Sequence, residues 1–420
     1  MGRILTAIDV EAAAKAGQGL AMASGDRLTP LARDRAKELG VTLLAGGAPG
    51  AAAAPAASAP IASPAPTPAA AAPVAPPPSA GRPLLLPPSG AMYRRNALGP
   101  SGPGGAARDA RPKAGVVGAG HVGAMTALRL AESDLFSQVT LVDVVPGLAA
   151  GLALDMWHGA GLYGFSTRLI GSDDLAALAG AEYIVITAGK PRQPGMSRTD
   201  LTAVNAEIMA SVCGGIRTHA PDSTLVIVSN PLEEMTYLAA KHTGFAEERV
   251  LGMAGVLDSA RFCALVGLTG KARPQEVRAL ALGSHGPEMV IPLSQAFVGG
   301  SPIESLLDAD TLAAIVERAR ESGGEVVKLL QKGSAYFSPA ESAATMVRAM
   351  VRDSGEVLAA CIRSRGAYGT VDTRVGLPVR LHRRGLKEIV TLALRPAEQQ
   401  ALKEAAARIA ARIDELATPR

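Results

Sequence analysis

The segment KAGVVGAGHVGAMTALRLAES, residues 113 to 133, constrains the fold more than any other part of the chain. Its apolar start predicts a buried strand, the glycines Gly118, Gly120 and Gly123 predict a tight turn, and the remainder predicts a helix. Glycine lets the backbone approach a pyrophosphate closely, and the start of a helix supplies amide donors and a partial positive charge. The segment therefore predicts a dinucleotide-binding turn.

A second predicted strand, VTLVD, ends at Asp143, 20 residues after Gly123. A carboxylate at this place accepts hydrogen bonds from the hydroxyls of an adenine ribose and repels a 2′-phosphate. Val144 and Val145 follow, where an arginine would be needed to accommodate such a phosphate. These residues favour NAD over NADP as the cofactor.

Strands and helices continue to alternate after this unit. Strands are expected at residues 183 to 187 and 225 to 229, with an amphipathic helix at 201 to 219 between them. This order predicts an α/β fold: a Rossmann-type doubly wound parallel sheet that binds ligands at the carboxyl ends of its strands. Later residues predict an α+β substrate and catalytic domain, with a strand in VRALALG, strands near 357 to 362 and 379 to 381, and helices at 308 to 331, 339 to 353 and 396 to 416.

The loop ITAGKPRQPGMSRTDL, residues 186 to 201, carries two arginines, Arg192 and Arg198. Its prolines and glycines make it stiff in places and hinged in others, which suits a lid that closes over a small anionic molecule. Two solvated surface arginines are the alternative.

Five further residues are candidates for chemistry. Asn230 follows a predicted strand and could bind a cofactor amide or a substrate hydroxyl, or simply form a turn before Pro231. Asp258 and Arg261 share one face of an otherwise apolar helix, which suggests an enclosed pair rather than a surface ion pair. His285 lies at a strand end, where it is either structural or a general base oriented by a carboxylate. Ser338 could contribute to a pocket wall.

The ordered motifs GAGHVG, VD, ITAGKPRQPGMSR, VSNP, VLDSARF and GSHGPEMV resemble the lactate/malate dehydrogenase family over residues 113 to 418. Within it, PRQPGMSR looks like the malate dehydrogenase branch. The resemblance implies that His285 accepts the proton and that Asp258 is its carboxylate partner. It also implies that Arg261 binds the substrate's C1 carboxylate, that Arg192 binds its distal carboxylate, and that Arg198 polarises the reacting carbonyl.

The resemblance implies NAD-dependent, reversible oxidation of malate to oxaloacetate by a homo-oligomer, a dimer or a tetramer. A dehydrogenase of another 2-hydroxy acid, such as lactate, is one alternative. A non-catalytic nucleotide-binding scaffold is another, although such a protein would not need the histidine, the aspartate and three arginines together.

The chain before residue 112 does not share this resemblance. Residues 1 to 45 predict two short helices, at 10 to 16 and 29 to 39, and are similar to N-terminal segments of enzymes associated with bacterial microcompartments. LTPLARDRAKELGV also resembles the helix in the subunit-binding domains of acyltransferase complexes, and a dispensable extension is the alternative. Residues 46 to 111 are rich in alanine, proline and glycine and predict a disordered tether. The expected division is a docking or targeting segment at 1 to 45, the tether, an NAD-binding domain at 112 to 256 and a catalytic domain at 257 to 420.

Composition excludes several classes of protein. The formal net charge is only +4 and acidic and basic residues are nearly balanced, which argues against a nucleic-acid partner. Three widely spaced cysteines without CxxC or neighbouring histidines predict neither disulfides nor a metal site. The N-terminus lacks a long apolar run, so we expect neither a secretory signal nor a membrane segment, and a cytoplasmic protein that could be encapsulated in a microcompartment.

Overall fold

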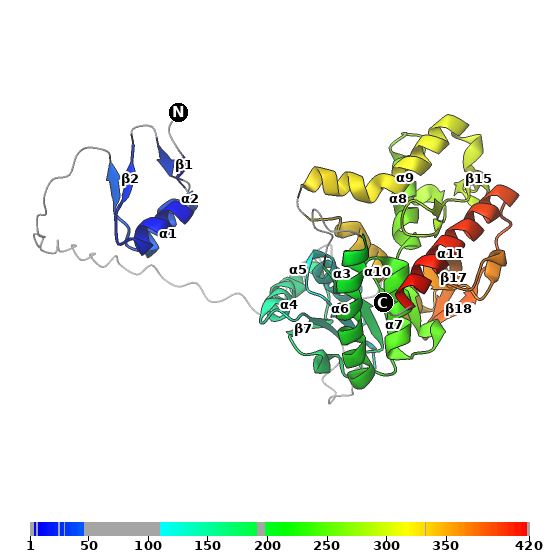
Figure 1. Ribbon diagram of the computed structural model, residues 1–420, viewed down its shortest axis with the longest axis horizontal. Helices are drawn as coiled ribbons and strands as arrows, with labels where there is room; N and C mark the ends of the chain where they lie inside the picture. The colour runs from blue at the N-terminus through cyan, green and yellow to red at the C-terminus, as the bar shows by residue number, and fades with distance from the viewer. Residues whose placement is uncertain are drawn as a thin grey trace, which may run out of the picture. The chain divides into compact units, whose positions relative to one another are not determined.

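A computed structural model describes residues 4–5, 7–23, 26–28, 30–45, 110–190, 198–331 and 333–417. The chain divides into two compact units, Met1–Arg82 and Pro83–Arg420 (Figure 1), and each is described by itself. Nearly all of the predicted tether lies outside the described residues. Arg111, the last residue assigned to it, donates hydrogen bonds to Asp134 and so belongs with the second unit.

The first unit contains both predicted helices, α1 (Ala7–Lys15) and α2 (Pro30–Glu38). Val10, Ala32 and Ala36 form its small core between them. The sequence did not predict its four short strands, which are β1 (Ile4–Leu5), β2 (Leu20–Met22), β3 (Arg27–Leu28) and β4 (Leu43–Ala45). Strands of two or three residues are too short to show alternation, and only pairing with a distant segment defines them.

The first unit is an internal duplication. Strand β1 pairs with β3 and β2 with β4, both in parallel, and in each pair the partners lie 23 residues apart, as in Leu5 with Leu28 and Leu20 with Leu43. Each half has a nine-residue helix followed by a glycine with a φ of 64°. Parallel pairing between equivalent residues is what a two-fold axis along the strands would produce. The repeated Leu-Thr before each helix is the sequence signal of this duplication.

The second unit is built on a continuous sheet of eleven strands, whose parallel half has the order β10-β9-β8-β5-β6-β7. The chain begins in the middle of this half, at β5, and winds outward in both directions, which confirms the predicted doubly wound fold. Its strands are β5 (Lys113–Val117), β6 (Gln138–Val142), β7 (Arg168–Ser172), β8 (Tyr183–Ile186), β9 (Thr224–Ile227) and β10 (Val250–Gly252).

Helices flank the parallel strands (Figure 1). They are α3 (His121–Glu132), α4 (Leu148–His158), α5 (Ala160–Tyr163), α6 (Arg198–His219) and α7 (Leu232–Thr243). The central strands β8 and β9 are buried along their whole length because apolar layers cover both faces. Continuous apolar runs, rather than alternation, are therefore the signal that located them in the sequence.

The antiparallel half continues the same sheet, because Gly252 of β10 pairs with Cys361 of β16. It consists of β12 (Leu282–Gly283), β13 (Met289–Val290), β16 (Val357–Arg363), β17 (Arg374–His382) and β18 (Gly385–Ile389). A separate small sheet contains β11 (Val277–Arg278), β14 (Phe297–Val298) and β15 (Ser301–Pro302). The helices of this half are α8 (Gly255–Gly267), α9 (Ala309–Leu330), α10 (Phe337–Arg352) and α11 (Pro396–Ala417).

The segment VRALALG forms two strands and not the single strand that was predicted. Strand β11 belongs to the small sheet and β12 to the large one, and between them the Ala281 N–H donates to the Ser259 hydroxyl at 2.9 Å. Gly283 then has a φ of 81°, which favours glycine. This break directs the chain that follows toward His285.

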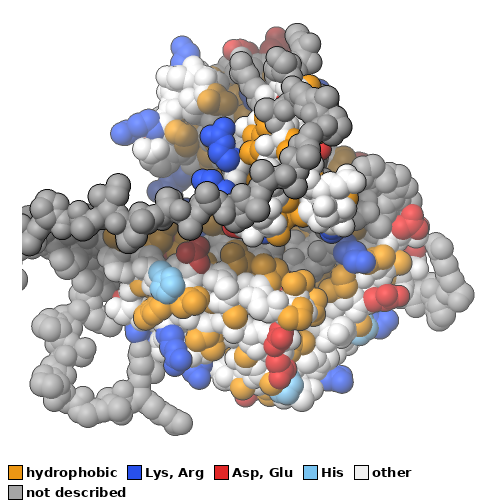
Figure 2. Space-filling view, turned by 90° about the vertical axis from the view of Figure 1, so that its left-hand side faces the viewer, with side chains coloured by type: hydrophobic (Ala, Val, Ile, Leu, Met, Phe, Trp, Pro, Cys, Tyr) orange, Lys and Arg blue, Asp and Glu red, His pale blue; other side chains and the backbone are white. Residues whose placement is uncertain are grey.

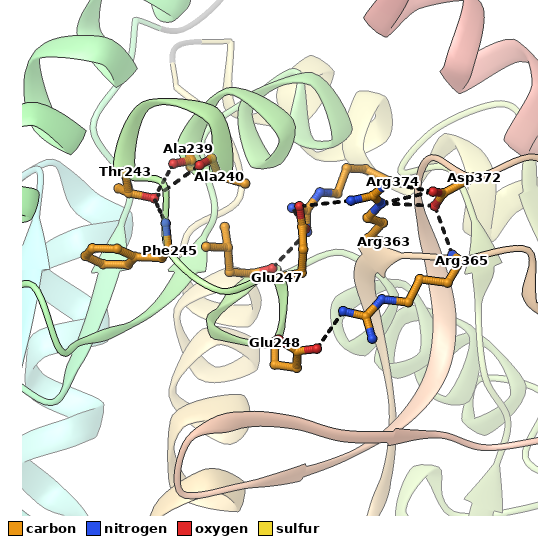
Figure 3. Close-up of polar contacts among 11 residues, drawn as sticks. Ala239, Ala240, Thr243, Phe245, Glu247, Glu248, Arg363, Arg365, Asp372 and Arg374 are labelled. Atoms are coloured by element: carbon orange, nitrogen blue, oxygen red, sulfur yellow. Dashed lines mark hydrogen bonds and ion pairs between the residues drawn. The ribbon is translucent and has the colours of Figure 1, made fainter.

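A polar network joins the turn after α7 to the β16–β17 hairpin (Figure 3). Arg374 is 3% exposed, pairs with Glu247 and donates to the Val250 carbonyl at 3.1 Å. Arg363 pairs with Asp372 at 2.8 Å within the hairpin. Burial lowers the pKa of Arg374, and the carboxylate of Glu247 opposes this effect. The buried charge of Arg374 is therefore compensated by Glu247, and the pair holds the hairpin against the turn after α7.

The described residues contain neither a membrane-spanning helix nor a metal-binding cluster. No helix in those parts of the chain is both long enough and apolar enough to cross a bilayer. Nor does the described part contain a group of three or more histidine, cysteine or acidic side chains placed to hold a metal ion.

Candidate active site

A cavity of about 500 Å³ lies at the carboxyl ends of the parallel strands. Its walls come from the glycine turn, the ends of β8 and β9, and helices α8 and α9. Among the residues that line it are Gly120, Asn230, Arg261, His285 and Tyr336. The fold thus brings together candidates that are up to 165 positions apart in the sequence, Gly120 and His285.

Each of the three positions in the turn requires or favours glycine for a different structural reason. Gly118 has a φ of 101°, and a Cβ there would lie 2.7 Å from the backbone N of Ala188. A Cβ on Gly123 would collide with the Gly118 carbonyl. A Cβ on Gly120 would meet nothing within 4 Å, yet Gly120 lines the cavity. The open space at Gly120, beside the start of α3, fits the close approach of a pyrophosphate.

Asp143 is held directly beside this turn. Its Oδ2 accepts the Ala119 N–H at 2.6 Å, and its Oδ1 accepts the Val145 N–H at 3.0 Å. These bonds fix the carboxylate directly after β6, beside the glycine turn that follows the neighbouring parallel strand β5. The geometry suits the ribose hydroxyls of NAD.

We expect Asp143→Ser to relax the choice of cofactor toward NADP. The serine removes a negative charge that would repel the 2′-phosphate, so the NADP/NAD ratio of kcat/KM should rise at least roughly tenfold, or about 1.4 kcal/mol. Steady-state rates with both cofactors measure this ratio. Asp222→Ser, at an exposed position in the turn after α6 (Arg198–His219), is the control. An unchanged ratio in Asp143→Ser would contradict the role given to Asp143.

His285, Asp258 and Arg261 form one connected group. The ring Nδ1 of His285 lies 2.8 Å from Oδ2 of Asp258, and Nη1 of Arg261 donates to the other oxygen of Asp258 at 3.1 Å. The Asp258 side chain is 2% exposed, whereas those of His285 and Arg261 are 23% and 15% exposed. The aspartate is therefore enclosed, and the two residues that it holds face the cavity.

The environment of His285 acts on its pKa in opposite directions. Burial lowers the pKa of His285, but the charge of Asp258 and its hydrogen bond raise it, and the net result is a raised pKa. A base whose pKa lies above the ordinary histidine value holds a proton more tightly once it has taken it up.

Asn230 also lines the cavity, directly after β9. Its carbonyl accepts a hydrogen bond from Nδ2 of Asn205 at 2.7 Å. Asn205 also accepts the Lys190 N–H at 2.8 Å and donates to the Lys190 carbonyl. One buried side chain on α6 therefore joins the strand ends that carry Asn230 and the arginine-containing loop.

Of three further predicted site residues, two have no described side chain and the third does not line the cavity. Arg192 lies outside the described residues, and Arg198 begins α6 without a described side chain. Ser338 does not line the cavity. Its carbonyl accepts the Ser342 hydroxyl within α10, and the nearby Tyr336 lines the wall instead.

Sequence reasoning missed two buried polar residues near the site, Asn205 and Glu233, each 2% exposed. Asn205 interrupts the apolar face of a helix, which is a usable signal. Glu233 contacts His285 only because α7 lies beside the loop after β12, and no local pattern indicates that contact.

Comparisons with known proteins cover nearly the whole second unit. The model of the lactate/malate dehydrogenase NAD binding domain matches residues 112–252, and that of the family's alpha/beta C-terminal domain matches residues 255–418. The malate dehydrogenase of Chloroherpeton thalassium is 43% identical over 291 residues, which are 69% of this chain and 94% of that protein. That of Synechocystis is 43% identical over 300 residues, covering 71% of this chain and 92% of that protein.

Solved structures agree with the sequence comparisons. Malate dehydrogenase from Salinibacter ruber superposes with a TM-score of 0.69 at 37% identity, covering 72% of this chain and 97% of that one. Lactate dehydrogenase from Cryptosporidium parvum, complexed with lactic acid and nicotinamide adenine dinucleotide, gives 0.71 at 31% identity, covering 74% and 99%. The predicted family and fold are confirmed, and the chain belongs to the lactate/malate dehydrogenase family.

Proposed function

We propose that this protein is an NAD-dependent malate dehydrogenase that interconverts malate and oxaloacetate. One observation carries the proposal: His285, Asp258 and Arg261 form a connected acid–base and guanidinium group in the cavity that the dinucleotide turn opens into. The relatives described above, named as malate dehydrogenases, support the same activity. A scaffold protein would have no need for this connected group.

Each residue of the group has its own role in the proposed reaction. NAD, when bound, supplies the nicotinamide carbon that takes up or gives the hydride. His285 takes the hydroxyl proton of malate, while Asp258 holds the ring in one orientation and stabilises the imidazolium. Arg261 matches the C1 carboxylate with two parallel hydrogen bonds and so orients C2. In the reverse direction the same imidazolium returns the proton to the carbonyl oxygen of oxaloacetate.

The roles proposed for two further arginines come from the family resemblance. Arg192 would bind the second carboxylate, and Arg198 would stabilise negative charge that develops on the carbonyl oxygen, an effect worth roughly 3 to 4 kcal/mol for such donors. Asn230 would bind the cofactor amide and the substrate hydroxyl.

Rates of the purified full chain with oxaloacetate, pyruvate and other 2-oxo acids, each with NADH and NADPH, test the proposal. We expect oxaloacetate with NADH to be the preferred pair. Preference for pyruvate would favour a lactate dehydrogenase, and no turnover with any 2-oxo acid would favour a non-catalytic scaffold.

We expect Arg192→Gln to weaken the discrimination between oxaloacetate and pyruvate by about 2 to 5 kcal/mol, because glutamine leaves the distal carboxylate without a cation. The ratio of kcat/KM for the two substrates measures this change. Arg320→Gln, on α9 and outside the cavity lining, is the matched control. A preference for oxaloacetate that survives in Arg192→Gln would assign the second carboxylate to another residue.

We propose that the second unit forms a homo-oligomer, a dimer or a tetramer. Four large side chains on α4 and α5 are at least 40% exposed: Leu154, Trp157, Leu162 and Tyr163. Figure 2 looks onto the side where these helices lie and shows hydrophobic side chains gathered on its lower part. Such an apolar surface is typical of a contact between copies of a chain.

Residues 1 to 45, in the first unit, are proposed to form a docking or targeting module, with residues 46 to 111 as a tether. We propose a protein partner such as a microcompartment shell, and a cytoplasmic location. The small core between α1 and α2, in a compact unit of its own, supports this role. A tether of this kind raises the local concentration of an enzyme at a partner surface. The proposed domains of the enzyme are residues 112 to 256 and 257 to 420.

Deleting residues 1 to 110 is expected to leave kcat and KM unchanged. The deletion removes the first unit and the tether but keeps Arg111, whose side chain contacts Asp134. Steady-state kinetics check the enzyme, and a fluorescent reporter fused to residues 1 to 45 checks relocation. A large loss of turnover would show that the extension is part of the active fold.

A further inference from the structure

A second buried carboxylate contacts His285 from a different helix. Glu233, near the start of α7, is 2% exposed, and its Oε1 accepts the backbone N–H of His285 at 2.6 Å. Asp258, on α8, holds the ring of the same histidine. Two acidic side chains therefore fix His285, one through its backbone and one through its imidazole.

Glu233 has no compensating cation in the parts of the chain that the structure describes, where no Lys or Arg lies within ion-pair distance of it. Its neighbour Glu234 is equally buried but pairs with Arg412 at 2.9 Å. Burial raises the pKa of Glu233, and the hydrogen bond from the His285 backbone opposes that effect. Burying a carboxylate without an ion pair costs free energy of folding. The position of Glu233 beside a histidine that titrates therefore needs an explanation.

The charged groups around His285 come from several elements. They are Asp258 and Arg261 on α8, Glu233 and Glu234 on α7, Glu288 in the turn after β12, Arg412 on α11 and Lys190 after β8. Burial lowers the pKa of His285. Asp258 and then Glu233 raise it, and Arg261 lowers it. The influence of Glu233 on the pKa of His285 thus adds to that of Asp258.

We propose that Glu233 is a positioning residue that fixes the backbone of His285 and whose negative charge stabilises the imidazolium formed when His285 takes the substrate proton. Glu233 does not touch the reacting atoms, and the two groups titrate as a coupled pair. The effect of Glu233 on proton transfer from the substrate rests on the proposed function. Its effect on the backbone and the titration of His285 does not.

Glu233→Gln separates the charge from the hydrogen bond. The glutamine oxygen still accepts the His285 N–H, but the negative charge is gone. Glu233→Asp keeps the charge on a shorter side chain. Glu234→Gln is the matched control: it makes the same change at an equally buried neighbour, and Arg412 keeps Glu288 at 3.5 Å.

The first test is the pH dependence of kcat/KM with malate, which requires neutral His285. Because Glu233→Gln removes a negative charge, the pKa of His285 should fall, and the acid limb should move to lower pH by about half to one unit. Glu233→Asp keeps the charge, so its midpoint should lie close to that of the wild type. Glu234→Gln should shift the midpoint much less than Glu233→Gln does, because the Glu234 carboxylate pairs with Arg412. If Glu233→Gln lowers kcat by the same factor at every pH and leaves the midpoint unchanged, Glu233 is only structural.

The second test does not depend on catalysis. The histidines of the full chain, six in number, are isotopically labelled and titrated by NMR without substrate, and the spectrum of His285→Asn identifies the signal of His285. The His285 signal should titrate at lower pH in Glu233→Gln than in the wild type, and an unchanged midpoint would overturn the inference. If the wild type fails to turn over malate, the proposed function fails while this titration still decides the coupling.

Discussion

Replacing His285 by asparagine is expected to reduce turnover in both directions roughly 10³-fold or more, while the affinity for NADH stays unchanged. Asparagine can occupy the same site and hydrogen-bond to Asp258, but it cannot take up a proton from the substrate hydroxyl. The ring of His285 faces the cavity, and its other side is fixed by Asp258 at 2.8 Å. Steady-state kinetics with malate and oxaloacetate measure turnover, and fluorescence titration measures NADH binding.

His242→Asn is the control for this change. His242 lies in the last turn of α7 and does not line the cavity, so the variant should keep wild-type kinetics. Turnover by His285→Asn within tenfold of the wild type would refute the role of His285 as the base. A parallel loss of NADH affinity would point instead to a damaged fold.

Arg261→Lys is expected to lower kcat/KM for oxaloacetate roughly 100-fold, although the positive charge is retained. This corresponds to a loss of about 3 kcal/mol of transition-state stabilisation. A guanidinium can bind the C1 carboxylate with two parallel hydrogen bonds, and an ammonium cannot reproduce that geometry. Lysine also cannot easily keep the 3.1 Å bond to Asp258 and reach the substrate at once. The rise in KM should account for most of the effect, and kcat should fall less.

Arg320→Lys serves as the control for Arg261→Lys, since it makes the same exchange on α9 outside the cavity lining. Its kinetics should match those of the wild type. If Arg261→Lys binds and reduces oxaloacetate as well as the wild type does, a single cation is sufficient and the two-bond geometry is not needed. NADH affinity, measured in the same variants, separates substrate binding from cofactor binding.

The parts of the fold that the sequence predicted are those with strong local signals. The glycine turn, the strand ending at Asp143 and helices α9 to α11 follow from residue types whose conformational preferences act over a few residues. The candidate site followed from ordered motifs, so His285, Asp258 and Arg261 could be assigned to one site before their distances were known. Local patterns gave neither the strands of the first unit nor the break at Ala281, since both depend on distant partners.

The sequence alone determined the family, the doubly wound sheet, the preference for NAD and the identity of the main candidate residues. Only the tertiary structure decided that Asn205 joins two strand ends and that Glu233 holds the backbone of His285. The physical reason is that the free energy of a buried polar group depends on the partners that packing brings to it, and those partners lie far away along the chain. In Glu233 this dependence is clearest, because α7 and the loop after β12 meet across 52 residues of sequence.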